Sequence, residues 1–252
     1  SAILFLVYSL QRPVYYFIIN LVVCDVLFST ATLPKIISRY WFQDETISFL
    51  GCCVQMFFVH YLCGVCSNVL VVMVMDRYAA ICYPLQYHNT VSLLQILLAC
   101  AVIWVICISW LSVVVYHAFD EPYCDSNVIT QNYCDQNSII KLSCGDVRQK
   151  KFFSFSCAMF VLLGPLIFIM FSFIAIITSV FKISDVQARY KTFPTCTPQL
   201  FIICLYYVPR CVVYVHDVTI AISPGIRVML IMWYSLLPPV CFYTLQRTTV
   251  EA

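Results

Sequence analysis

Charge is scarce in this sequence of 252 residues. Only 10% of the residues are Asp, Glu, Lys or Arg, 62% are hydrophobic, and there are only 5 glycines. A soluble domain needs more charge than this on its surface and cannot bury so much apolar material. The composition therefore predicts a protein that is solvated by membrane lipid.

The sequence also lacks the features of several functional classes. The formal net charge is +2 and no basic run is present, so nothing indicates a nucleic-acid partner. The histidines and carboxylates are scattered over separate segments, so we expect neither an enzyme nor a cofactor. Paired half-sequences and charged pore rings, which would favour a transporter or a channel, are absent as well.

What the sequence has instead is long apolar runs. About 20 apolar residues cross the hydrocarbon core as a helix. The predicted helices cover residues 14–34, 51–78, 93–116, 152–181, 195–214 and 228–245. Residues 2–8 are apolar but too few to span, and we interpret them as the end of a first helix that is largely missing. No soluble domain interrupts these runs, so residues 1–252 are expected to form a single transmembrane domain.

The 16 cysteines fall into two groups. Most lie singly within apolar runs, where a thiol behaves as a small hydrophobic side chain. Three others lie ten residues apart in the polar loop before residue 152, namely Cys124, Cys134 and Cys144. Together with Cys52 they predict two disulfides on an extracellular face, because disulfides persist in oxidising compartments. Four cysteines allow three pairings and Cys53 competes with Cys52, so these residues alone leave the pairing open.

One segment connects these observations to a family. Residues 75–87 read Met-Asp-Arg-Tyr-Ala-Ala-Ile-Cys-Tyr-Pro-Leu-Gln-Tyr, so that an apolar run ends at an acid-base-aromatic triplet and the chain then turns at a proline. The segment resembles the end of the third transmembrane helix of the olfactory receptors, a branch of the rhodopsin-like G-protein-coupled receptors. Segments 10–17, 133–135, 142–146 and 190–196 resemble further motifs of this family.

The resemblance implies an all-α membrane protein, a seven-transmembrane-helix bundle in the plasma membrane. Its partners would be a small-molecule odorant, a heterotrimeric G protein and membrane lipid. Asp76, Arg77 and Tyr78 would couple to the G protein, since an arginine at a helix end can pair with an acid at rest and be released to a partner. The bases in the short loops also favour a cytoplasmic location for this triplet. A different interpretation is a non-signalling remnant, the product of a truncated gene or a pseudogene.

The disulfide pairing and one excluded ligand class also come from the resemblance. It selects Cys52 with Cys134 and Cys124 with Cys144, because the loop motifs around these cysteines match those of the family. The position at which amine receptors of the wider class carry an aspartate holds Val59. Biogenic amines are therefore disfavoured as ligands.

Asp25 lies within the first long apolar run, where a carboxylate needs a proton, a cation or a partner. In the receptor family the corresponding aspartate belongs to a sodium and water site. Here Cys66 occupies the position of a supporting acid, and the Asn-Pro-x-x-Tyr motif is represented only by residues 238–243. Both a sodium ligand and a protonated structural residue therefore stay possible for Asp25.

The expected ligand site follows from helical spacing. Residues three and four apart share a helix face, and one such set is Phe57, His60, Cys63, Gly64 and Ser67. A second set is Tyr207, Arg210 and Tyr214. The resemblance implies that both faces border the odorant cavity.

Arg210 leads us to expect an anionic ligand, because a guanidinium presents a rigid fork of donors to a carboxylate. The alternative is that Arg210 snorkels outward or pairs with Asp217.

Overall fold

The structure is a computed structural model. It describes residues 13–44, 46–83, 86–87, 92–119, 147–182 and 200–212, together with 134, 136, 139, 142, 144, 197, 226, 229 and 230. Four long helices lie in this part of the chain, namely α2 (Pro13–Trp41), α3 (Phe49–Cys82), α5 (Leu93–Phe119) and α7 (Val147–Lys182). A shorter apolar helix covers Leu200–Val212. None of the residues just named lies in a β-strand, in agreement with the all-α prediction.

Each long helix contains a stretch that is long and apolar enough to cross a membrane. The four helices cover the predicted ranges 14–34, 51–78, 93–116 and 152–181 and extend beyond most of their ends. The helix predicted to end at Pro34 continues to Trp41, because a membrane helix tolerates a proline within it. Most of the predicted range 228–245 lies outside the described residues, so the number of seven helices stays a prediction.

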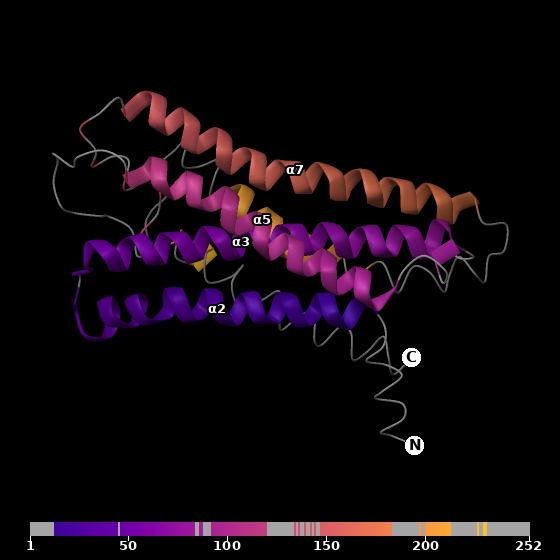
Figure 1. The fold of residues 1–252 in the computed structure, drawn as a ribbon, viewed down its shortest axis with the longest axis horizontal. Coiled ribbons are helices and arrows are strands. Elements are labelled where there is room, and N and C mark those ends of the chain that lie inside the picture. Colours follow the sequence, from indigo (N-terminus) through magenta and orange to yellow (C-terminus); the bar gives the residue numbers. More distant parts are fainter. Residues whose placement is uncertain are drawn as a thin grey trace, which may run out of the picture.

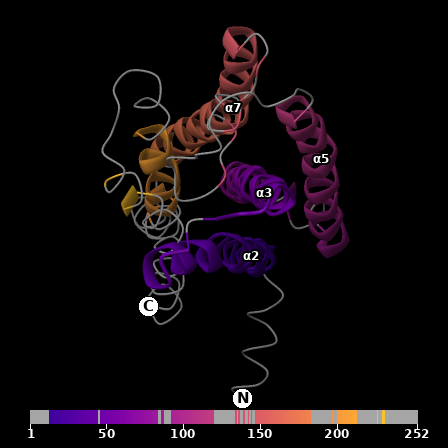
Figure 2. The same ribbon diagram turned by 90° about the vertical axis from the view of Figure 1, so that its left-hand side faces the viewer.

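Helix α3 lies at the centre of the bundle, with α2, α5, α7 and the helix Leu200–Val212 around it (Figures 1 and 2). Its most apolar stretch is 56% buried inside the protein, whereas the corresponding values for the other long helices are 17% to 28%. At about 1.5 Å per residue, its 34 residues reach from one side of a bilayer to the other and beyond. A change at one end of α3 is therefore connected to the other end by one continuous helix.

A polar junction fixes three of these helices against one another. The indole N–H of Trp104 on α5 donates to Asn20 Oδ1 on α2 at 3.0 Å. The hydroxyl of Tyr61 on α3 donates to the backbone oxygen of Trp104, also at 3.0 Å. Hydrogen bonds of this kind set the relative position of helices in lipid, where apolar burial alone selects no partner.

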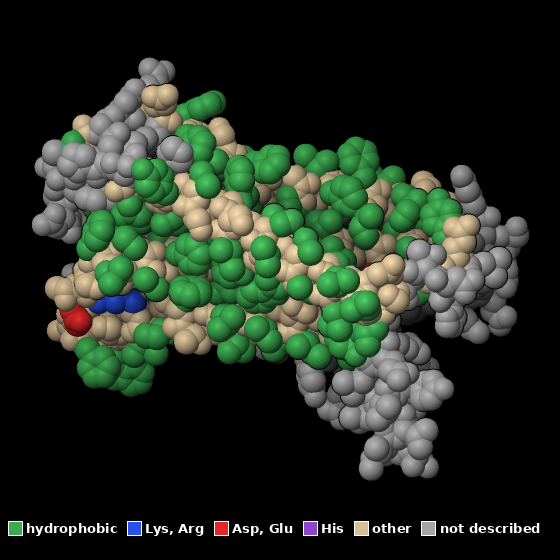
Figure 3. All heavy atoms as spheres, in the orientation of Figure 1, with side chains coloured by type: hydrophobic (Ala, Val, Ile, Leu, Met, Phe, Trp, Pro, Cys, Tyr) green, Lys and Arg blue, Asp and Glu red, His purple; other side chains and the backbone are tan. Residues whose placement is uncertain are grey.

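The outer surface carries the apolar side chains that the sequence predicts for contact with lipid. In Figure 3 hydrophobic side chains cover the middle of the visible face, and the charged side chains of the described residues that are seen on that face lie at one end. Several of the most exposed apolar residues lie on α5 and α7, including Val105 (63%), Phe160 (71%) and Phe171 (68%). This distribution is the one expected for a multi-pass membrane protein.

Candidate functional site

The predicted extracellular disulfide joins Cys52, in the first turn of α3, to Cys134 in the loop that follows α5. The S–S distance is 2.00 Å and the two Cα atoms are 5.3 Å apart. The competing residue Cys53 is a free cysteine. The pairing of Cys52 with Cys134 is therefore confirmed.

The second predicted disulfide is described at one end only. Cys144 is disulfide-bonded, whereas Cys124 lies outside the described residues. The pairing of Cys124 with Cys144 stays a prediction.

The predicted ligand-binding residues of α3 divide between two sides of the helix. Phe57 stacks on Tyr61, which is bonded to α5, with ring centroids 5.7 Å apart. Gly64 also faces α5, since a Cβ atom there would lie 3.7 Å from the sulfur of Cys107. Cys63 and Ser67 instead contact the helix Leu200–Val212. Spacings of three and four spread over about 100° of the helix, which is wide enough to reach two neighbours.

Tyr206 makes the contact from the helix Leu200–Val212. Its hydroxyl donates to the backbone oxygen of Cys63 at 2.9 Å and lies 3.3 Å from the hydroxyl of Ser67. The prediction named the next residue, Tyr207, because spacing along one helix does not show which tyrosine meets the neighbouring helix. Tyr206 could have been considered from the sequence, because it stands next to Tyr207 in the same apolar run and a buried tyrosine hydroxyl needs a partner. Both tyrosines are buried in the structure.

Arg210 points into the bundle. Its guanidinium carbon lies 3.9 Å from the centre of the Tyr206 ring, and the residue is only 9% exposed. It is also within hydrogen-bonding range of the Cys63 thiol. This burial argues against the alternative in which Arg210 snorkels outward to the membrane surface. The alternative pairing of Arg210 with Asp217 and the predicted role of Tyr214 stay predictions, because both residues lie outside the described part of the chain.

Tyr207 adds a buried hydroxyl to the same region. Its side chain is 2% exposed, and its ring meets that of Tyr206 edge to face at 5.1 Å between centroids. The hydroxyl is buried and lies near the side chain of Ser67 on α3. His60, one turn above Cys63 on α3, is partly buried.

Asp25 lies near a guanidinium and two thiols. The guanidinium of Arg210 attracts the Asp25 carboxylate electrostatically, and the Cys63 and Cys66 thiols lie close enough to interact with it. Both predicted roles of Asp25, a sodium ligand and a protonated structural residue, stay predictions. Within the described part of the chain, no group of three or more His, Cys, Asp or Glu side chains could hold a metal ion.

At the other end of α3, Asp76 has a partner that the sequence did not predict. The hydroxyl of Tyr87 donates to Asp76 Oδ1 at 2.7 Å. Burial raises the pKa of Tyr87, and its hydrogen bond to the Asp76 carboxylate raises it further. Arg77 attracts the same carboxylate electrostatically. Asp76 is therefore shared between the predicted neighbour and a tyrosine that follows the turn at the end of α3.

Two further contacts surround this end of α3. The rings of Tyr78 and Tyr83 meet edge to face with centroids 6.1 Å apart. The thiol of Cys82 donates to the hydroxyl of Ser179 on α7 at 3.2 Å. The triplet Asp76-Arg77-Tyr78 thus lies where α3 meets α7 and the start of the following loop.

Comparisons with known proteins agree with this arrangement. The profile of the olfactory receptor family matches residues 1–247. Human olfactory receptor 52K1 is 33% identical over 234 residues, which are 92% of this chain and 74% of that receptor. Human olfactory receptor 51E2 is 33% identical over 237 residues, 92% of this chain and 73% of that receptor.

The fold is also found among solved structures. The crystal structure of squid rhodopsin matches with a TM-score of 0.69 at 18% identity and covers 96% of this chain and 77% of its own. The predicted resemblance is confirmed, since both the family profile and the curated relatives extend over nearly all of the chain. The chain belongs to the olfactory receptor family and is a multi-pass plasma-membrane protein, a receptor rather than an enzyme.

Proposed function

We propose that this chain binds a small-molecule odorant within the helix bundle and activates a heterotrimeric G protein at the cytoplasmic end of α3. One observation carries the proposal. A single continuous helix, α3, contacts a buried polar cluster near its middle and carries Asp76-Arg77-Tyr78 in its last turns. A ligand that rearranges the cluster would therefore act on the same rigid element that carries the coupling triplet.

The ligand-binding cluster, in this proposal, consists of Cys63, Ser67, Tyr206, Tyr207 and Arg210. It supplies a hydroxyl pair, a buried phenol and a guanidinium held on an aromatic ring. His60, one turn from Cys63 on α3, stays a proposed ligand-binding residue. Phe57 and Gly64 contribute to the site by packing towards α5.

Arg210 gives the cluster a preference for anionic ligands. A guanidinium forms charge-assisted hydrogen bonds with a carboxylate that are roughly twice as strong as neutral ones. Its stacking on Tyr206 fixes the plane of the fork, so less conformational entropy is lost when a ligand binds. The electrostatic attraction between Asp25 and Arg210 opposes this preference, because an acidic ligand must compete with the Asp25 carboxylate for the guanidinium.

The coupling residues are Asp76, Arg77 and Tyr78. In the resting arrangement Asp76 accepts a hydrogen bond from Tyr87 and attracts Arg77. Activation would release Arg77 to the G protein as the cytoplasmic ends of the helices move apart.

The test is a signalling assay in cells that supply an olfactory-type stimulatory G protein. Exposure to a panel of odorants, with carboxylic acids included, should raise cyclic AMP in cells that display the receptor. Cells that lack either the receptor or the G protein are the controls. A receptor that reaches the surface and responds to no odorant, in cells whose adenylyl cyclase is active, would contradict the proposal.

A further inference from the structure

Gln55 is a buried polar residue in the apolar first half of α3. It is 6% exposed and lies one helical turn after Cys52, on the same side of the helix. Burying an amide costs free energy unless both its donor and its acceptor find partners. The partners of Gln55 therefore indicate why this position holds an amide.

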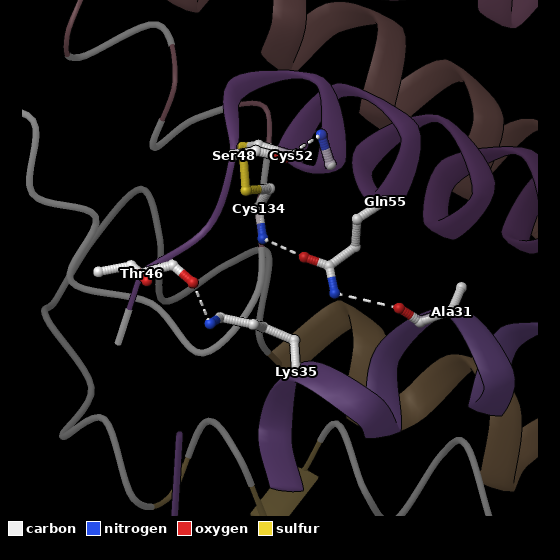
Figure 4. The surroundings of a disulfide bond; sticks show 8 residues. Ala31, Lys35, Thr46, Ser48, Cys52, Gln55 and Cys134 are labelled. Carbon is white, nitrogen blue, oxygen red and sulfur yellow. Dashed lines mark hydrogen bonds between the residues drawn. A yellow bond between two sulfur atoms is a disulfide. The ribbon is translucent and has the colours of Figure 1, made fainter. Parts of the chain in front are cut away.

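Both ends of the Gln55 amide are bonded, and they reach different segments (Figure 4). The side-chain nitrogen donates to the backbone oxygen of Ala31 on α2 at 3.1 Å. The side-chain oxygen accepts from the backbone N–H of Cys134 at 3.1 Å. One side chain thus joins α3, α2 and the loop that carries the disulfide.

The loop at Cys134 is packed into this end of the bundle. Cys134 and Ile139 are 2% and 3% exposed and form a buried cluster with Cys52 and Met56 of α3. Val115 of α5 packs against the same cluster. The disulfide fixes the distance from Cys134 to α3. The two hydrogen bonds of Gln55 connect Cys134 to α2 as well.

The end of α2 to which Gln55 is bonded is itself held in place. Lys35, one turn beyond Ala31, donates to the backbone oxygens of Asp44 and Thr46 in the connection between α2 and α3. Its ammonium nitrogen is also 3.8 Å from a carboxylate oxygen of Asp44. The backbone oxygen of Ala31 is therefore a fixed point against which Gln55 can hold the loop.

We propose that Gln55 is a positioning residue that holds Cys134 in register with α2, so that Cys134, α2 and the first turns of α3 form one fixed wall, about two helical turns of α3 before Cys63. The effect on ligands rests on the function proposed above. The effect on the loop does not, and it can be measured without any odorant.

The loop is tested by hydrogen–deuterium exchange at the Cys134 amide in the purified full chain. Gln55→Leu keeps the apolar volume and removes both hydrogen bonds, so the exchange rate should rise about tenfold. Asn68→Leu is the matched control, since it removes a partly buried amide from the same helix whose described hydrogen bonds reach Gly64 and Cys107, and should leave Cys134 unchanged. An exchange rate in Gln55→Leu within about twofold of the parent chain would overturn the proposal.

Gln55→Glu separates hydrogen bonding from packing and decides the matter if Gln55→Leu does not fold. A protonated carboxyl donates and accepts as the amide does, whereas a carboxylate can only accept. The carboxylate keeps the acceptor for the Cys134 N–H and loses only the donor to Ala31. The ratio of Cys134 exchange rates, variant to parent at the same pH, should therefore approach one at about pH 5 and depart from one at about pH 8. A ratio that does not change with pH would show that the side chain acts by packing alone.

The consequence for ligands is measured separately. With the loop released, Gln55→Leu should weaken the potency of an odorant that activates the parent receptor by about tenfold. Unchanged potency, together with faster Cys134 exchange, would overturn the claim that this wall shapes the ligand site. A parent receptor without any odorant response would contradict the proposed function, and the exchange measurements would still decide the role of Gln55.

Discussion

The two ends of α3 are held in different ways. At the disulfide end, a covalent bond to Cys134 and both hydrogen bonds of the Gln55 amide fix the helix to its neighbours. At the Asp76 end, the described contacts include no covalent bond: Tyr87 and Cys82 each donate one hydrogen bond, and Arg77 attracts the Asp76 carboxylate electrostatically. Breaking one bond at the first end leaves others in place, whereas each contact at the second end can be exchanged by itself.

This difference indicates which end can move. An allosteric element needs two arrangements that differ by only a few kcal/mol, and a hydrogen bond contributes about 0.5–1.5 kcal/mol, or up to about 3 kcal/mol when one partner is charged. Contacts of this size are comparable to the free energy that a ligand can supply. We therefore expect the disulfide end of α3 to act as the fixed point and the Asp76 end as the moving part.

The largest effect is expected for Arg77→Ala. If Arg77 is released to the G protein on activation, its removal should abolish the odorant-induced rise in cyclic AMP while the receptor still reaches the cell surface. Arg39→Ala, which removes a base at the opposite end of the bundle, is the matched control and should signal normally. Intact signalling by Arg77→Ala at equal surface density would remove Arg77 from the coupling role.

The disulfide end should be sensitive to Cys52 and insensitive to its neighbour. Cys52→Ser removes the bridge across a loop of 82 residues, and loss of a native disulfide typically costs about 2–5 kcal/mol of stability. Surface expression and thermal stability should both fall, whereas Cys53→Ser should leave them unchanged. Peptide mapping without reduction should recover Cys52 joined to Cys134. A stability loss in Cys53→Ser as large as in Cys52→Ser would contradict this asymmetry.

Between the two ends, Arg210→Gln tests the ligand-binding cluster. Loss of charge-assisted hydrogen bonds to a carboxylate, about 1.5–3 kcal/mol, should lower the potency of carboxylic acids by about 10- to 100-fold. The methyl esters of the same acids carry no charge and serve as internal controls, since their potency should change little. Esters as potent as their acids on the parent receptor, or acids undiminished on Arg210→Gln, would place Arg210 outside the binding site.

The fold could be predicted from the sequence because lipid imposes a simple rule. A span of about 20 apolar residues must be helical to satisfy its own backbone, so apolar runs alone placed α2, α3, α5 and α7. The helix ends were less accurate, as in α2, because Pro34 does not end a helix that its neighbours support. Cys52 was matched to Cys134 by motif, since the residues alone allowed three pairings.

The contacts between helices were the part that could not be predicted. Tyr206, which was not predicted, donates to α3, and spacing within one helix carries no information about the rotation of its neighbour. Gln55 had a signal that could have found it, because a polar side chain inside an apolar run needs partners. The sequence predicted a turn after α3 but not that Tyr87 would donate to Asp76, because a turn leaves the direction of its side chains open.

The smallest effect, and the sharpest test of the movable end, is expected for Tyr87→Phe. It removes the hydroxyl that donates to Asp76, and because Tyr87 is partly exposed we expect a cost to the resting state of about 1 kcal/mol, or a fivefold rise in ligand-free cyclic AMP. The raised pKa of Tyr87 keeps the hydroxyl protonated below its ordinary pKa of about 10, and the bond is lost only as the pH rises through the raised value. The effect should therefore be constant between about pH 6 and pH 8.

Combining Tyr87→Phe with Asp76→Asn completes a double-mutant cycle, in which the joint effect should be smaller than the sum of the single effects. Strict additivity would mean that the two side chains do not act together and that the resting state is held elsewhere.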